Sequence, residues 1–304
     1  MMQISSLIVG TRGSALALTQ TRHTVSEIET AVSGLAVEIR IVKTIGDRTT
    51  DASLSSFGGQ GVFVREIETA LLNGEIDAAV HSLKDLPVAL PVGLTIAAVS
   101  RRADARDALI SKKGLSLTEL PRGAVIATGS PRRRAQLAAF RPDLQFADIR
   151  GNIDTRLKKL VESPDLDAIV LACAGLDRMG WGDRITERIS PDICLPAVGQ
   201  GALAIETREN DKRVVAVVHR IDDPDTERAV SAERAFLRHA GGGCHTPLGA
   251  WARVTGQSLT LDGMMAAPDG AWLVRDIVEG AASDAETLGA RLAEKILRRS
   301  PESA

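Results

Sequence analysis

Residues 124–134, Ala-Val-Ile-Ala-Thr-Gly-Ser-Pro-Arg-Arg-Arg, run from a short apolar segment directly into the start of a helix. The apolar part, Ala124 to Ala127, predicts a buried strand. Ser130 is a favoured N-cap residue, and Pro131 suits the first helical position. The three arginines that follow oppose the helix macrodipole, at a cost of about a few tenths of a kcal/mol each where they are exposed. Because these cations lie where they destabilise the helix, we predict that an anion binds at its start.

The same step from strand to helix recurs along the chain. Leu7 to Gly10 predicts a short buried strand, and Ser14 is placed as the N-cap of the helix that follows it. Further on, the strand predicted over Gln145–Ile149 precedes a helix over 153–161, and Asp167–Ala172 predicts another strand before a short helix. Strands that alternate with helices are typical of parallel, doubly wound sheets. The sequence therefore predicts an α/β protein with two doubly wound lobes.

Basic residues fall at the ends of these strands or at the starts of the helices. In an open α/β sheet the ligand lies beyond the carboxyl ends of the strands, which is where Lys84 and Asp85 follow the strand predicted over Ile76–Val80. Guanidinium groups bind carboxylates through paired hydrogen bonds, so we expect a ligand with several carboxylates. The basic residues placed in this way are Arg12, Lys84, Arg132, Arg133, Arg150 and Arg156.

Composition restricts the class of protein. The chain has 304 residues, of which 44% are apolar, enough for two or three domains with real cores. The first ten residues lack a basic segment before an apolar core, and no apolar run approaches the roughly 20 residues of a membrane span. We therefore expect a cytoplasmic protein. Its three cysteines, without Cys-x-x-Cys spacing, favour reduced thiols over disulfides and argue against a structural metal site.

The net charge of −2 conceals a basic segment. Residues 101–160 contain ten Arg and four Lys against six acidic residues, a net charge of +8. Such an imbalance predicts an anionic partner. Only 3% of the residues are aromatic and none is Tyr, so platforms for stacking nucleic-acid bases are scarce. A small polyanion fits better than nucleic acid.

A single thiol stands in a glycine-rich segment, Gly241-Gly242-Gly243-Cys244-His245-Thr246-Pro247. Three glycines remove side-chain bulk in front of Cys244, so the thiol could be presented to a ligand. A helix that ends at glycine beside a small buried cysteine would give the same pattern. Both interpretations stay open on these residues alone.

The C-terminal part has a different pattern. Residues 247–279 alternate as three strands, and residues 282–299 predict an amphipathic helix, which together indicate a small α+β domain. We expect three domains: residues 1–99 with 200–219 as a first lobe, 100–199 as a second lobe, and 220–304 as the α+β domain. The polar loop over residues 44–61 suits a lid or binding loop.

Taken in order, several motifs resemble the porphobilinogen deaminase (hydroxymethylbilane synthase) family, and the resemblance runs essentially from end to end. No single motif is decisive, but the ordered set is specific. The motifs are Thr11-Arg12-x-Ser14, Gly58-Gly59-x-Gly61-x-Phe63, His81-Ser82-x-Lys84-Asp85-x-Pro87, Arg132-Arg133, Ile149-Arg150-Gly151-Asn152 with Arg156, Leu195-Pro196-Ala197-Val198-Gly199-Gln200-Gly201 and Gly242-Gly243-Cys244.

The resemblance implies a monomeric transferase of haem biosynthesis whose first two domains are similar to periplasmic binding proteins. It implies that four porphobilinogens are joined head to tail with loss of ammonia, after which the linear tetrapyrrole hydroxymethylbilane is released by hydrolysis. It also implies a dipyrromethane cofactor attached to Cys244 through a thioether, and Asp85 as the catalytic residue. By the same resemblance, Lys84, Thr128, Ser130, Arg132, Arg133 and Gly175 contact the cofactor, and Arg12, Ser14, Gln20, Arg150, Arg156 and Gln200 contact the substrate.

Some residues depart from the family pattern. Gln60 and Ser55-Ser56 stand where the family has lysines, and Gly129 and Pro131 replace a serine and an apolar residue. The predicted lid could therefore supply less positive charge than in the family. Two other functions compete with the deaminase: a two-lobed anion-binding protein without catalysis, and an acyl transferase that uses Cys244 and His245.

Overall fold

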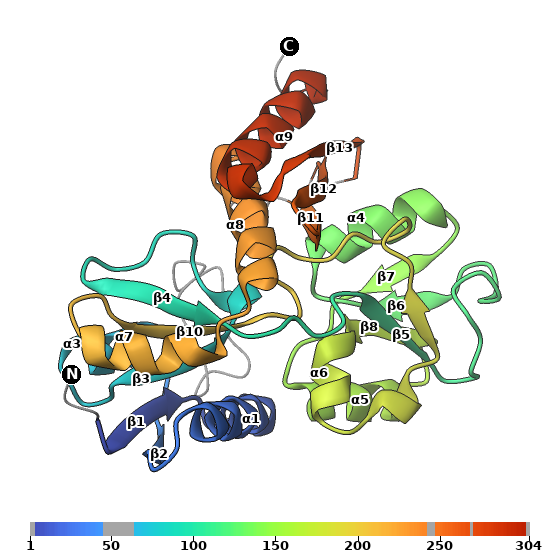
Figure 1. Ribbon diagram of the computed structural model, residues 1–304. Coiled ribbons are helices and arrows are strands. Elements are labelled where there is room, and N and C mark those ends of the chain that lie inside the picture. Colours follow the sequence, from blue (N-terminus) through green and yellow to red (C-terminus); the bar gives the residue numbers. More distant parts are fainter. Residues whose placement is uncertain (1–3, 45–63, 242–246, 268–269, 302–304) are drawn as a thin grey trace. The chain divides into compact units, whose positions relative to one another are not determined.

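The computed structural model describes residues 4–44, 64–241, 247–267 and 270–301. The chain divides into two compact units, shown in Figure 1. The first unit contains Met1–Arg102 and Ala202–Glu227, and the second contains Ala103–Gly201 and Arg228–Ala304. In the described parts of the chain, every helix is too short or too polar to cross a membrane.

The first unit is built on a five-stranded sheet in the order β2-β1-β3-β10-β4. β2, β1 and β3 are parallel, whereas β10 is antiparallel to both β3 and β4. The strands are β1 (Ser6–Thr11), β2 (Ala36–Ile41), β3 (Ala78–Ser82), β4 (Leu94–Val99) and β10 (Leu203–Arg208). The helical elements are α1 (Ala15–Ala31), α3 (Arg65–Leu72), α7 (Lys212–Val218) and the 3-10 helices η2 (Leu83–Asp85) and η4 (His219–Ile221).

Helices cover both faces of this sheet. Ile28 of α1 and Val218 of α7 belong to one apolar cluster with β1, β3 and β10. On the opposite face, Ile67 and Leu71 of α3 pack against Ala79 of β3 in a second cluster. The side chains of β1 and β3 therefore alternate between two separate cores, as expected for central strands of a buried sheet.

The second unit contains another five-stranded sheet, in the order β7-β6-β8-β5-β9. β7, β6 and β8 are parallel, and β5 is antiparallel to β8 and β9. The strands are β5 (Asp107–Ser111), β6 (Val125–Ala127), β7 (Gln145–Ala147), β8 (Ala168–Ala172) and β9 (Glu187–Ile189). The helices are α4 (Pro131–Phe140) on one face, α5 (Ile153–Glu162) and α6 (Cys173–Arg178) on the other, and the 3-10 helix η3 (Gly182–Arg184).

The predicted α/β lobes are confirmed, and parallel pairing covers three strands of each sheet. The structure differs from the predicted parallel sheets in β5 and β10, which run antiparallel to their neighbours. Each of them enters its sheet where the chain arrives from the other unit, and not after a helix that crosses the sheet it joins. Without that right-handed crossover, nothing requires a strand to run parallel to its neighbours.

The second unit also contains a three-stranded antiparallel sheet, β11 (Leu248–Thr255), β12 (Ser258–Ala266) and β13 (Leu273–Ala281). α9 (Ala285–Arg299) follows the 3-10 helix η5 (Ala282–Asp284) and packs on this sheet, and α8 (Pro224–His239) shares its core. The three strands and the closing helix predicted for the C-terminal part are confirmed. Ala250 N–H donates to Pro196 O at 3.0 Å, which ties β11 to the turn after β9.

Gly289 lets α8 and α9 approach each other closely. A Cβ atom at this position would lie 2.3 Å from Ala232 O and 2.7 Å from Phe236 N, both backbone atoms of α8. Backbone atoms within a packed helix cannot turn aside as the end of a flexible side chain can. The two helices would have to separate.

We predict that Gly289→Ala lowers the free energy of unfolding by about 1–3 kcal/mol, although alanine is the better helix former by about 1 kcal/mol. Urea unfolding followed by circular dichroism measures this change. Thr287→Ala, at an exposed position of the same helix, is the matched control and should leave stability unchanged or slightly higher. Equal stability of the Gly289→Ala and wild-type proteins would show that α8 and α9 are not in close contact.

Candidate active site

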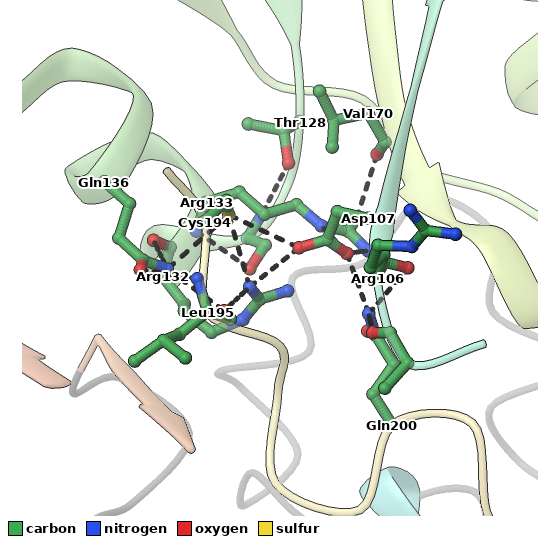
Figure 2. A network of polar contacts seen from close by, with 12 residues as sticks. Arg106, Asp107, Thr128, Arg132, Arg133, Gln136, Val170, Cys194, Leu195 and Gln200 are labelled. Atoms are coloured by element: carbon green, nitrogen blue, oxygen red, sulfur yellow. Dashed lines mark hydrogen bonds and ion pairs between the residues drawn. The ribbon is translucent and has the colours of Figure 1, made fainter. Parts of the chain in front are cut away.

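A fully buried carboxylate, Asp107, lies between two arginines at the first residue of β5 (Figure 2). Arg132 Nη1 donates to Asp107 Oδ2 at 2.8 Å. Arg133 donates to Asp107 Oδ1 through Nε at 3.0 Å and Nη2 at 2.7 Å. The two guanidinium groups are therefore fixed in place by one acidic side chain.

The start of α4 carries both arginines into the interior. Ser130 caps the helix, since its Oγ accepts from Arg133 N at 3.5 Å, and Thr128 Oγ1 in turn accepts from Ser130 N at 3.2 Å. Arg132 and Arg133 are 5% and 7% exposed. Arg134 lies instead on the exposed side of α4, where its Nη2 donates to Phe146 O at 2.9 Å. The sequence predicted an anion beside these arginines, and Asp107 is one that the chain itself supplies.

The turn over residues 194–201 contacts the same carboxylate. Gln200 Nε2 donates to Asp107 Oδ1 at 2.9 Å and to Ala105 O at 2.7 Å. Arg132 Nη1 also donates to Leu195 O, and Cys194 Sγ lies 3.4 Å from Asp107 Oδ2. We call Asp107, Arg132, Arg133, Cys194 and Gln200 the Asp107 network.

Gln136, one helical turn after Arg132 in α4, holds the segment over residues 194–201 in place. Leu195 N donates to Gln136 Oε1 at 2.8 Å, and Gln136 Nε2 donates to Leu195 O at 3.1 Å. The end of the turn also needs glycine, because Gly201 has φ +93° and a Cβ atom there would lie 2.6 Å from Ala103 O. The turn is therefore held against β5 and α4 at both of its ends.

The electrostatics of this network favour the ionised carboxylate. Burial by itself raises the pKa of Asp107, but the positive charges of Arg132 and Arg133 outweigh burial and hold the pKa well below its ordinary value. Burial and the charge of Asp107 raise the pKa of the Cys194 thiol to about 12, so Cys194 is a neutral thiol at physiological pH. One negative and two positive charges leave the network with an excess of one positive charge.

The predicted site residues of the first unit lie at the ends of β1 and β3. Ser14 caps α1, where its Oγ accepts from Ala17 N at 3.3 Å, and Arg12 is half-buried beside it. Gln20 of the same helix donates to Ser82 Oγ at 3.0 Å, which connects α1 to the end of β3. Asp85, the proposed catalytic residue, is exposed at the last position of η2.

Lys84, Arg150, Arg156 and Gly175 complete the predicted set among the described residues. Lys84 is half-buried in η2. Arg150 is exposed before α5, and Arg156 Nε donates to Gly151 O at 2.7 Å. Gly175 is buried in α6.

The structure thus brings together Arg132, Arg133 and Gln200 around Asp107, Thr128 with Ser130, and Gln20 with the end of β3. Cys244 lies outside the described residues, as do residues 45–61 of the predicted lid with Gln60 and Ser55-Ser56. Cys173 and Cys194 are free cysteines, and both are fully buried. In the described ranges, no group of three or more His, Cys, Asp or Glu side chains is arranged to hold a metal ion.

Sequence reasoning missed Asp107 and Gln136. The signal for Asp107 was a charged residue at the start of an otherwise apolar, buried strand, since a buried carboxylate needs a cationic partner. Gln136 gave a weaker signal, a polar residue one helical turn after Arg132 on the same side of α4. Its partner is a backbone segment that no periodicity identifies.

Comparison with known proteins identifies relatives of the whole chain. Residues 7–216 match the family model described as porphobilinogen deaminase, dipyromethane cofactor binding domain, and residues 228–298 match the model of the porphobilinogen deaminase C-terminal domain. The porphobilinogen deaminase of Geobacillus kaustophilus is 52% identical over 289 residues, covering 95% of this chain and 93% of its own. That of Bacillus subtilis is 51% identical over 287 residues, covering 94% and 90%.

Solved structures with a similar backbone are more distant. Substrate-binding domain 2 of Lactococcus lactis GlnP in its open conformation gives a TM-score of 0.45 at 10% identity, covering 79% of this chain and 93% of that one. The methionine-binding protein MetQ gives a TM-score of 0.41 at 15% identity, covering 70% and 90%.

We predict that Asp107→Asn lowers the free energy of unfolding at neutral pH by about 3–5 kcal/mol, because it leaves two buried guanidinium groups without their anion. A carboxylate whose pKa is lowered by folding stabilises the protein above its ordinary pKa, 3.8, and loses that contribution as the pH falls towards the lowered value. The difference between wild type and variant should therefore be largest near neutral pH and shrink below 3.8.

Urea unfolding at a series of pH values measures this difference. Asp165→Asn removes the same charge from an exposed position of the same unit and serves as the control. If Asp107→Asn were no less stable than that control at neutral pH, the carboxylate would not be the anion that balances Arg132 and Arg133.

Proposed function

The chain belongs to the porphobilinogen deaminase family, and we propose that it builds a linear tetrapyrrole on a dipyrromethane attached to Cys244 through a thioether. By its family, the chain is an enzyme of tetrapyrrole biosynthesis with porphobilinogen deaminase activity, and it has a dipyrromethane cofactor-binding domain. This membership excludes the acyl transferase and the anion-binding protein without catalysis. The observation that carries the proposal is the pair of family matches over residues 7–216 and 228–298.

In the proposed reaction, four porphobilinogens are joined head to tail with loss of one ammonia each, and water releases hydroxymethylbilane. A porphobilinogen that has lost ammonia carries positive charge on its pyrrole nitrogen. A carboxylate at that nitrogen stabilises the cation more than it stabilises the uncharged ring, which lowers the barrier to its formation. We assign this role to Asp85, which is exposed at the end of η2 and can also accept and return a proton.

The Asp107 network fits an acidic ligand. Its two arginines share one carboxylate, and the excess positive charge in a buried setting attracts a further anion. Within the described ranges, Arg133 makes hydrogen bonds through all three of its nitrogens, whereas the hydrogen bonds of Arg132 are made through Nη1. We therefore propose that Arg132 supplies most of the hydrogen bonds to cofactor carboxylates, and that Arg133 and Gln200 chiefly hold it in place.

We assign further cofactor contacts to Lys84, Thr128, Ser130 and Gly175. When bound, dipyrromethane supplies the pyrrole carbon that the first porphobilinogen joins.

The remaining substrate contacts are proposed at helix starts. Arg12 and Ser14 stand at the N-terminus of α1, and Arg150 and Arg156 at the start of α5. Backbone N–H groups and the macrodipole favour a carboxylate at such positions. Gln20 is assigned to the substrate through its place beside Ser82. Each added pyrrole brings an acetate and a propionate, so the need for cationic partners grows with the chain.

We further propose a monomeric, cytoplasmic enzyme of three domains, with boundaries at residues 1–99 and 200–219, 100–199 and 220–304. The two described α/β sheets and the separate antiparallel sheet support this division. The porphobilinogen that it consumes is a small soluble molecule, and no nucleic-acid or membrane partner is required.

Supplying porphobilinogen to the purified protein tests the reaction. We expect four ammonia molecules for each linear tetrapyrrole, and Asp85→Asn should lower kcat by about 100-fold or more, since it removes both the stabilising charge and the proton acceptor. The exposed Asp165→Asn is the control and should keep full activity. Ammonia released without a tetrapyrrole, or full turnover by Asp85→Asn, would contradict the proposal.

The attachment at Cys244 is tested by the mass of the intact protein. We predict that the wild-type protein is heavier than its sequence by one dipyrromethane and that Cys244→Ser has the mass of its sequence alone. Cys173→Ser is the matched control and should retain the added mass. An increment that persists in Cys244→Ser would place the attachment at another residue.

A further inference from the structure

Three ionisable side chains are buried together in the first unit, outside the site described above. Glu68 of α3 and His81 of β3 are each 6% exposed, and Glu206 of β10 is 0% exposed. His81 Nε2 lies 3.1 Å from Glu206 Oε2. We call these three residues the His81 cluster.

The register of the sheet explains why the three side chains meet. Glu206 is paired with Ala79, and His81 with Ala204. His81 and Glu206 are therefore diagonal neighbours on the same face of adjacent strands. Ala79 packs against α3, which places that face under the helix. Glu68 lies on the buried side of α3 and so comes down onto this face.

The surroundings of the cluster are apolar and offer few compensating charges. Ile67, Leu71 and Leu94 pack around the same face. Arg65, at the start of α3, acts on Glu68 only weakly. Arg208, two residues beyond Glu206 on β10, is already paired with two aspartates, Asp77 and Asp211.

A count of charges decides the protonation of the cluster. One imidazolium can balance one carboxylate, and a second buried carboxylate without a partner is costly. Among the described residues, Glu68 Oε1, both Glu206 oxygens and His81 Nε2 have no hydrogen-bond partner, so the 3.1 Å contact between His81 and Glu206 is an ion pair by distance. A cluster without net charge is reached when one carboxylate pairs with the imidazolium and the other is protonated, and the 3.1 Å contact makes Glu206 the partner of His81.

The cluster also lies directly behind the proposed catalytic segment. β3 ends at Ser82, one residue after His81, and η2 then carries Lys84 and Asp85. The first residue of η2, Leu83, donates its N–H to Ala202 O at 3.1 Å, just before β10 begins. The end of β3 and the start of β10 are therefore joined directly to η2.

We propose that Glu68, His81 and Glu206 form one proton-sharing cluster without net charge, which fixes the end of β3 and so positions Lys84 and Asp85. The three are positioning residues, and their effect on turnover rests on the role proposed for Asp85. Burial, and after it the charge of Glu206, raise the pKa of Glu68 against the smaller opposing effects of His81 and Arg65, in agreement with this assignment.

The sign of the pH dependence follows from the protonated state of Glu68. A carboxyl group whose pKa is raised by folding contributes its full stability below its ordinary pKa, 4.5, and loses it as the pH rises through the raised value. Glutamine has nearly the same shape and keeps its hydrogens at every pH. Glu68→Gln should therefore remove this loss.

The first test measures thermal unfolding of the full chain without substrate, between about pH 5 and about pH 9. We expect Glu68→Gln to match wild type at the acidic end and to exceed its melting temperature by roughly 2–4 °C at the alkaline end. Glu29→Gln, an exposed substitution in α1, should follow wild type throughout. A Glu68→Gln protein that is less stable than wild type by the same amount at every pH would overturn the assignment.

A second measurement does not depend on the folding of any variant. The ¹⁵N chemical shifts of His81 in the wild-type protein at neutral pH should show hydrogens on both ring nitrogens, because Glu206 holds the imidazolium. A ring with one hydrogen would contradict the balanced cluster.

The link to catalysis is tested by the pH profile of kcat/KM. Glu68→Gln should retain more of its activity than wild type on the alkaline side, whereas Glu29→Gln should not differ from wild type. Superimposable profiles for wild type and Glu68→Gln would refute the positioning role. If Asp85→Asn proved fully active, the role of Asp85 would fail, but the unfolding and chemical-shift measurements would still decide the protonation of the cluster.

Discussion

The pairing of Asp107 with Arg132 and Arg133 is the interaction on which the second unit depends. Burying three charged groups is costly unless each has an opposite charge and its hydrogen bonds. Here one carboxylate meets both guanidinium groups at 2.7–3.0 Å and joins β5, the start of α4 and, through Gln200, the turn that leads to β10. The same contacts fix the cationic groups before any ligand arrives, which reduces the cost of ordering them when an acidic ligand binds.

The two units balance their buried charges in different ways. The Asp107 network keeps one positive charge in excess, which suits a site for carboxylates. The His81 cluster is proposed to reach neutrality by holding protons, which suits a support for Asp85, the proposed catalytic residue. A fourth buried acid among the described residues, Glu233 of α8, accepts backbone N–H groups from Gly199 at 2.7 Å and Ala252 at 2.8 Å and so joins the turn to β11 within the second unit.

Much of the fold could be predicted from local sequence because its signals are periodic or positional. The caps at Ser14 and Ser130 are present, and the alternation over residues 247–279 gives three antiparallel strands. The antiparallel direction of β5 and β10 could not be predicted, since it depends on how the chain passes between the units and not on the residues of either strand. Motif and charge likewise identified Arg132 and Arg133 as important.

The partner of those arginines is 25 and 26 residues away along the chain, on another element, so no local pattern indicates it. Gln200 is a second residue whose partner in the structure could not be predicted from the sequence. The resemblance to the family implied that Gln200 contacts the substrate, whereas in the structure its side-chain amide donates to Asp107. Its contact with substrate stays a prediction, as do the roles of Asp85 and Cys244.

Asp107 fixes the positions of Arg132 and Arg133 without any contribution from the cofactor. The most direct measurement is a crystal structure of the Cys244→Ser protein, which removes the proposed attachment point. We predict that Arg132 and Arg133 still contact Asp107 in the Cys244→Ser protein, at about 2.8 and 2.7 Å. Guanidinium groups turned away from Asp107 towards solvent in that structure would contradict it.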